Sequence, residues 1–271
     1  MLTLRVGCEF AWKAEIPTAI VVQVEPRSDG PEIITESWTT HPPLASRHYA
    51  DRFGNTCRRL TIPAGETRLG YDARVLVTGE LDPADYDAPE VAPQDLPESA
   101  LLFMLPSRFC HSDVLADAAW QRFGSTPRGY KRVEAICDFV HHHLTFTLGS
   151  STPTTTAVDV YNSGQGVCRD FAHLLITFCR ALNIPARYAF GYLPDIDVEG
   201  PLPAMDFCAW TEVFLGNRWY TFDARNNARR IGRVLIGRGR DAVDVAMVTA
   251  YGGPQLMEMT VWADQLPGLP A

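Results

Sequence analysis

The sequence lacks several features that whole classes of protein require. It has no excess of positive charge, since 24 lysines and arginines stand against 32 aspartates and glutamates and the formal charge is −8. Nucleic acids and anionic membranes need a cationic protein surface, so we expect neither as a partner. No apolar run approaches the roughly 18 residues of a membrane-spanning helix. The first residues also lack the charged, apolar and cleavage regions of a signal peptide.

The cysteines form no CxxC pair and are odd in number, which excludes a complete disulfide framework and the spacing of a zinc ribbon. They are scattered along the chain, at Cys8, Cys57, Cys110, Cys137, Cys168, Cys179 and Cys208. Because unpaired cysteines of this kind are typical of reducing compartments, we expect a cytoplasmic location.

Residues 1–80 alternate between apolar and polar side chains in the manner of strands, and proline and glycine clusters separate the alternating segments. We expect a small antiparallel sandwich or barrel here. Residues 81–98 are rich in proline and acidic residues and predict an extended connector. Residues 99–271 then form a second unit. The strands predicted in the first unit span residues 2–10, 19–24, 58–62 and 71–77.

Helical periodicity dominates the first half of the second unit, and strands dominate the rest. The three adjacent histidines at 141–143 end one predicted helix. Their side chains point about 100° apart, which favours a solvated helix end over a metal site. The predicted helices span residues 113–123, 127–144, 157–161 and 168–182, and the predicted strands span residues 187–193, 207–215, 218–223, 243–248 and 256–262.

The stretch from Gly164 to Leu174 carries the strongest functional signal. Two glycines, Gly164 and Gly166, lead into Cys168, which begins the helix predicted for 168–182. The first turn of a helix has unpaired amides and the positive end of the helix dipole, and both predict a lowered thiol pKa. The glycines allow a substrate carbonyl to approach the sulfur closely. Cys168 is therefore the candidate nucleophile.

Residues 207–223 predict a β-hairpin, because Gly216 and Asn217 form a two-residue loop between alternating segments. The loop length determines the register of the two strands. The predicted pairs are Leu215 with Arg218, Val213 with Tyr220, Thr211 with Phe222, Trp210 with Asp223, and Cys208 with Arg225.

In this register Cys208 and Asp223 are diagonal neighbours on one face of the hairpin, which they share with Trp210, Glu212 and Arg225. A thiol nucleophile needs a base beside it and a carboxylate that orients the base. Positions 208 and 223 are suitable for that pair of groups. The residue at the base position, however, is a cysteine.

Together these motifs resemble the bacterial members of the transglutaminase-like cysteine hydrolase superfamily, whose core is papain-like. The resemblance implies an α+β fold in which a cysteine-bearing helix packs on an antiparallel sheet, and residues 1–80 resemble the N-terminal β domain of many such members. The matching motifs are Gly164-x-Gly166-Val167-Cys168-Arg169-Asp170-Phe171-Ala172, Arg180-Ala181-Leu182-Asn183-Ile184-Pro185-Ala186-Arg187-x-x-x-Gly191-Tyr192, Ala209-Trp210-x-Glu212 and Trp219-x-x-Phe222-Asp223.

By this resemblance Cys168 has the nucleophile position and Asp223 that of the orienting acid, while Cys208 replaces the family histidine that precedes Ala-Trp. The loss of a positioned acid or base typically costs a factor of roughly 10² to 10⁴ in rate. His173 lies five residues beyond Cys168, about 140° around the helix, and points elsewhere. Arg225 is able to stabilise a thiolate but not to transfer a proton.

Three interpretations follow. Cys168 performs acyl chemistry on a peptide or amide, with the oxyanion on its own amide and on Gln165, and with Trp210 and Arg225 beside the substrate. Alternatively, the chemistry is impaired and the chain is a peptide-binding or scaffold protein. Thirdly, Cys168 and Cys208 form a redox or soft-metal pair with Asp223. The acyl chemistry needs no cofactor, and the expected partner is a peptide or protein.

Overall fold

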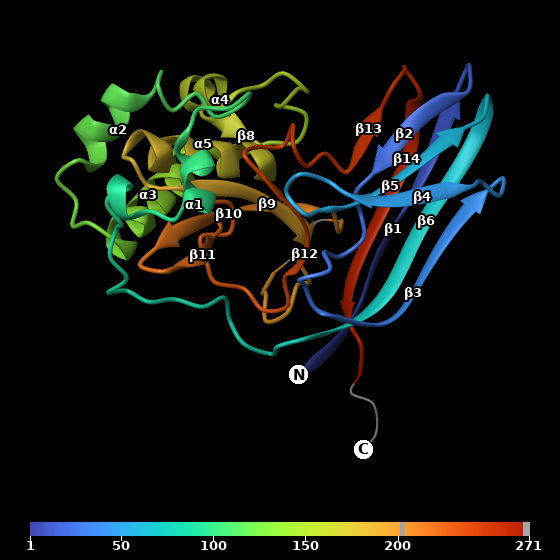
Figure 1. Ribbon diagram of the computed structural model, residues 1–271, viewed down its shortest axis with the longest axis horizontal. Helices are drawn as coiled ribbons and strands as arrows, with labels where there is room; N and C mark the ends of the chain where they lie inside the picture. Colours follow the sequence, from blue (N-terminus) through green and yellow to red (C-terminus); the bar gives the residue numbers. More distant parts are fainter. Residues whose placement is uncertain (201–203, 268–271) are drawn as a thin grey trace.

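Long antiparallel strands occupy one side of the molecule and a group of helices occupies the other (Figure 1). The computed structural model describes residues 1–200 and 204–267. Within these ranges the chain forms a mixed fold of mostly antiparallel sheets with few helices, which confirms the predicted α+β class.

Two four-stranded sheets form the strand-rich side, in the orders β14-β1-β6-β3 and β13-β2-β5-β4. Alternate residues along β1, among them Leu4, Val6 and Phe10, are buried in the core that both sheets share, as the alternation in the sequence predicts. The strands are β1 (Leu2–Ala14), β2 (Thr18–Val22), β3 (Glu32–His41), β4 (Ser46–Ala50), β5 (Thr56–Ile62), β6 (Gly65–Val77), β13 (Val248–Ala250) and β14 (Gln255–Gln265).

The four strands predicted for residues 1–80 are confirmed as β1, β2, β5 and β6. The sequence did not reveal β3 and β4, because both lie at sheet edges and almost all of their residues are exposed or half-exposed, so no alternation marks them. The strand predicted at 243–248 is wrong, since that segment is mainly turns and irregular chain. The strand predicted at 256–262 is confirmed as part of β14.

The last two strands of the chain pair with the first two. Strand β14 runs antiparallel along β1, and β13 pairs with β2. Residues 99–271 are predicted as one unit, but β13 and β14 complete the two sheets of the N-terminal segment. A local pattern identifies a strand without identifying its partner, so a pairing across almost the whole chain was not predictable.

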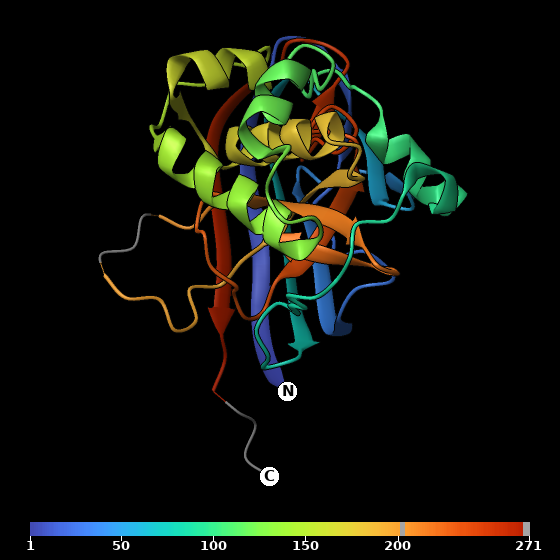
Figure 2. The same cartoon turned by 90° about the vertical axis from the view of Figure 1, so that its left-hand side faces the viewer.

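The other side of the molecule consists of five helices and a third sheet, of order β11-β10-β9-β12 (Figure 2). A short parallel pair joins β7 to β8. The elements are α1 (Glu98–Leu101), α2 (Ala116–Phe123), α3 (Tyr130–His143), α4 (Ala157–Ser163), α5 (Cys168–Ala181), β7 (Thr145–Phe146), β8 (Gln165–Gly166), β9 (Ala186–Tyr192), β10 (Cys208–Leu215), β11 (Arg218–Phe222) and β12 (Val234–Gly239), with the 3₁₀ turns η1 (Pro93–Asp95) and η2 (Leu102–Met104).

Each predicted helix is present, although α2 begins at Ala116 and α3 at Tyr130, a few residues later than predicted. No helix in the described ranges is long and apolar enough to cross a membrane. The two sides share one core, and polar contacts also join them: the hydroxyl of Tyr192 on β9 donates to the carbonyl of Val24 at 2.8 Å.

The pairing of β14 with β1 predicts a contrast between two residues of that strand. Val261 is buried and lies opposite Cys8, whereas Leu256 is 39% exposed. We expect Val261→Asn to lower the free energy of unfolding by about 2–4 kcal/mol, because an amide would be buried without a partner. Leu256→Asn should change it by less than about 0.5 kcal/mol. Urea titration measures both, and equal effects would contradict the packing of β14 against the core.

Candidate active site

Two glycines and an aspartate determine where α5 begins. Gly164 ends α4 in the left-handed conformation, with φ of 68°. A Cβ on Gly166 would lie 2.8 Å from the Cβ of Asp170, so only glycine fits beside that side chain. The carboxylate of Asp170 accepts the amide hydrogen of Val167 at 2.9 Å. This contact satisfies an amide at the helix start and makes Cys168 the first residue of α5.

Helix α5 is buried along nearly its whole length, and it packs against β9 and β10. The hydroxyl of Thr211 on β10 donates to the carbonyl of Ala172 on the helix at 3.3 Å. Because the helix is enclosed by the core, its position is rigidly determined and only its first turn reaches the surface.

Cys168 opens onto a groove of about 540 Å³. All seven cysteines lie in the described part of the chain, and Cys168 is half-exposed while the other six are buried. Its thiol lies 3.8 Å from the carbonyl oxygen of Phe207, just before β10. The groove also holds the second cysteine of interest; its lining includes Cys168, Tyr188, Asp206, Cys208, Met247 and Val248.

The pKa of Cys168 differs in direction from the sequence-based expectation. Burial raises it, and the amides of Ala209 and Arg169 and the charge of Arg225 offset this only in part. Asp206 raises it further. The prediction of a lowered pKa is therefore wrong, because the removal of the sulfur from water outweighs the favourable helix start.

The hairpin register is confirmed for residues 211–222, where Thr211 pairs with Phe222 and Leu215 with Arg218. The extension of this register is wrong. Strand β11 ends at Phe222, and the chain then turns, with the amide of Asn227 donating to the carbonyl of Asp223 at 2.7 Å. Cys208 pairs instead with Gly191 on β9.

Asp223 lies close enough to Cys208 to raise the pKa of its thiol, but the carboxylate of Asp223 is paired with Arg233. Burial is the largest cause of the raised pKa of Cys208, and Asp223 is the next. The carboxylate of Asp223 accepts from Arg233 at 2.9 Å and from the side-chain amide of Asn226 at 2.7 Å. Arg233 also donates to Asp82 at 2.8 Å, so one buried guanidinium joins two carboxylates.

The other predicted binding residues do not line the groove. Gln165 is exposed on β8. Trp210 is buried against Ala189 and Leu235, with the guanidinium of Arg233 4.9 Å from its ring centre. The ring of Trp210 therefore packs internally, in the manner of a packing wall, and does not line the groove.

Neither Arg225 nor His173 is among the residues that line the groove. The guanidinium of Arg225 lies 4.6 Å from the ring centre of Phe146, near enough to both cysteines to lower their pKa. His173 is fully buried, accepts the amide hydrogen of Ala242 at 3.1 Å and does not line the groove.

Asp206 is a site residue that the sequence analysis missed. It lines the groove, and burial raises the pKa of its carboxyl. Its only signal in the sequence was its place two residues before Cys208, which no spacing rule singles out. Within residues 1–200 and 204–267 no group of three His, Cys, Asp or Glu side chains is arranged to hold a metal ion.

Comparison with known proteins identifies the family. The model of the transglutaminase-like superfamily matches residues 118–224. An uncharacterized protein of Mycobacterium leprae is 26% identical over 250 residues, which cover 88% of each protein. The crystal structure of a candidate cysteine protease from Cytophaga hutchinsonii is 30% identical, with a TM-score of 0.87, and the match covers 100% of this chain and 92% of that one. The chain belongs to the transglutaminase-like superfamily.

Another relative matches over a shorter stretch of the chain. An uncharacterized protein of Mycobacterium tuberculosis is 32% identical over 129 residues, which cover 42% of this chain and 40% of that protein. The superfamily model covers the segment that contains α3, α4, α5 and the hairpin. The part of this transglutaminase-like protein that carries Cys168 and Asp223 is therefore the part that defines the family.

The pKa of Cys168 in this transglutaminase-like protein predicts its alkylation by iodoacetamide. Cys168 should be modified before buried Cys57 and Cys179, because it is the accessible thiol. Its rate should rise about tenfold per pH unit from pH 7 to pH 9, since only the thiolate reacts and the pKa is raised. Peptide mass spectrometry identifies the site, and Cys168→Ser is the control. A plateau below pH 8 would show that the helix start outweighs burial.

The charge network around Arg233 predicts a large effect on stability. Arg233→Met leaves the buried carboxylates of Asp82 and Asp223 without their cation, which should cost about 3–5 kcal/mol in the free energy of unfolding. Arg229 is exposed and donates only to the backbone carbonyl of Asp82. Arg229→Met should therefore stay within about 0.5 kcal/mol of the parent in urea unfolding. Similar values for the two variants would disprove the role given to Arg233.

Proposed function

We propose that the protein is a thiol acyl hydrolase or transferase that acts on peptide or amide bonds through Cys168. The observation that carries this proposal is the position of the half-exposed Cys168 thiol at the start of α5, in a groove that also contains position 208. A nucleophile and its acid–base partner must both contact the substrate, and residues 168 and 208 both line this groove.

In the first step the Cys168 sulfur attacks the carbonyl carbon of the substrate. A carbon–sulfur bond forms, the carbon–nitrogen bond breaks, and the amine leaves with the proton that the thiol carried. Water or a second amine then attacks the thioester, the carbon–sulfur bond breaks, and the proton of the attacking group returns to the sulfur. The developing oxyanion faces the amides at the first turn of α5, which have no partner inside the helix.

Proton transfer limits this reaction. Cys208 is a buried thiol with a raised pKa, so it does not act as a base near neutral pH. Asp223 is paired with Arg233. Asp206, whose carboxyl has a raised pKa, is the carboxylic acid among the described residues that line the groove. We therefore infer slow turnover of amides and faster turnover of activated esters, whose leaving groups need no proton.

The decisive experiment introduces a histidine at the base position. Cys208→His should raise kcat/KM for a small p-nitroanilide or p-nitrophenyl ester by about 10² to 10⁴, because an imidazole beside Cys168 accepts and returns the proton. The assay is release of p-nitroaniline or p-nitrophenol followed by absorbance.

Two controls make the result specific. Cys208→Ala should give no gain, since it removes the thiol without supplying a base. Cys168→Ala combined with Cys208→His should be inactive. No gain from Cys208→His in a folded protein, or a gain that survives the loss of Cys168, would refute the assignment of positions 168 and 208.

A second candidate function is peptide binding without turnover. The observations that favour it are the raised pKa values of Cys168 and Cys208 and the pairing of Asp223 with Arg233, all of which oppose catalysis. It requires that Cys168→Ala bind peptides as tightly as the parent while both hydrolyse nothing.

A redox or soft-metal pair of Cys168 and Cys208 with Asp223 is not proposed, because the Asp223 carboxylate is already engaged by Arg233 and Asn226. A reducing compartment such as the cytoplasm remains part of the proposal, supported by seven free cysteines.

A further inference from the structure

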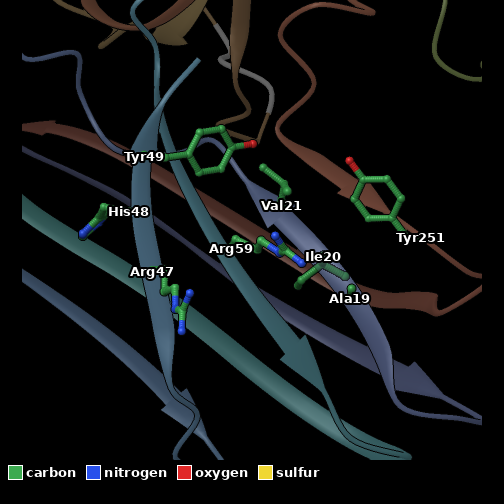
Figure 3. A pocket seen from close by; sticks show the side chains of 8 residues that line it. All are labelled: Ala19, Ile20, Val21, Arg47, His48, Tyr49, Arg59 and Tyr251. Atoms are coloured by element: carbon green, nitrogen blue, oxygen red, sulfur yellow. The ribbon is translucent and has the colours of Figure 1, made fainter.

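A second hollow lies on the outward face of the sheet β13-β2-β5-β4, apart from the Cys168 groove (Figure 3). Its volume is about 530 Å³. Alternation along the strands determines its composition, because Ile20 and Leu60 point into the core while their neighbours point outward. We call it the arginine–tyrosine hollow; it is lined by Ala19, Ile20, Val21, Arg47, His48, Tyr49, Arg59 and Tyr251.

Two arginines lie side by side in this hollow, and neither has an anionic partner among the described residues. Arg47 on β4 pairs directly with Arg59 on β5. Over residues 1–200 and 204–267 neither guanidinium makes a hydrogen bond or an ion pair. The neighbouring Arg58, by contrast, is paired with Glu25 at 2.8 Å. Like charges directly opposite in a sheet repel each other, so an added anion would relieve a cost that the protein itself leaves uncompensated.

Two tyrosine rings flank the arginines. In Figure 3 the rings of Tyr49 and Tyr251 stand on either side of Val21, with Arg59 beside them. The residues are 46% and 71% exposed. Tyr49 lies on edge strand β4 and Tyr251 follows edge strand β13, so the hollow spans three strand spacings, or about 14 Å. Its length and openness suit an extended chain better than a compact ion.

Strand β13 lies between the hollow and the Cys168 groove. Val248 at the start of β13 lines the groove, and Tyr251 just after its end lines the hollow. The two residues are three positions apart, which is about 10 Å along an extended chain. Binding at the hollow does not depend on the proposed function.

We propose that the arginine–tyrosine hollow binds an acidic segment of an extended polypeptide. The carboxylates of that segment pair with Arg47 and Arg59, and its chain lies across Val21 between the two tyrosine rings. Local charge complementarity selects this partner, because the hollow carries two cations that have no anionic partner among the described residues, although the formal charge of −8 on the whole chain opposes an anion at longer range.

The test uses the full chain with Cys168→Ala, so that turnover plays no part. The probe is a fluorescein-labelled twelve-residue peptide in which Glu alternates with Thr, and fluorescence anisotropy measures its Kd. We expect the double change Arg47→Ala and Arg59→Ala to weaken binding about tenfold, and Tyr49→Ala to weaken it about fivefold. Added salt should weaken binding to the parent chain more than to the double variant.

Arg74 supplies the matched control, because it is an exposed arginine on β6, in the other sheet, also without an ion pair among the described residues. Arg74→Ala should leave Kd unchanged, and a peptide with Gln for Glu should not bind. Arg47→Glu with Arg59→Glu should lose the Glu peptide and bind one with Lys in its place. Equal losses with Arg74→Ala, or undiminished binding to the double variant, would overturn the proposal. So would arginine-dependent binding of an oligonucleotide or of phosphatidylserine vesicles without binding of the Glu peptide.

Discussion

The burial of α5 is the constraint on which the rest of this site depends. The helix is enclosed by α3, α4 and the strands β9 and β10, so its axis has no freedom to shift and its first residue always meets the same edge of the sheet. The same burial that positions the Cys168 sulfur also withdraws it from water and raises its pKa. The burial that fixes the position of the sulfur therefore disfavours the thiolate, and a cation beside the sulfur would be needed to lower the pKa again.

Arg225 offsets the effect of burial in part, while the cation that pairs with Asp223 is engaged in the fold. Arg233 joins Asp223 to Asp82, and its guanidinium also covers Trp210. A protonated imidazole at position 208 would bring its own positive charge to the groove, whereas the neutral thiol of Cys208 brings none. Asp223 consequently serves the stability of the fold in the structure, through Arg233 and Asn226.

The strand-rich side also contributes residues to the wall of the Cys168 groove. Because β13 and β14 return from the end of the chain to pair with β2 and β1, the segment that forms one wall of the Cys168 groove continues into the sheet that bears Arg47 and Arg59. A shared core joins both sides, so a ligand bound on the sheet and one bound in the groove contact a single rigid body.

The sequence by itself determined the α+β class, the helix that begins at Cys168 and the hairpin pairs up to Phe222, because these follow from local periodicity, glycine positions and loop length. Only the tertiary structure decided the rest. The partner of β14, the raised pKa of Cys168, the internal packing of Trp210 and the ion pair between Asp223 and Arg233 each depend on which distant segment lies against a residue. Periodicity says which face of a segment is buried, but it does not say what is buried against it.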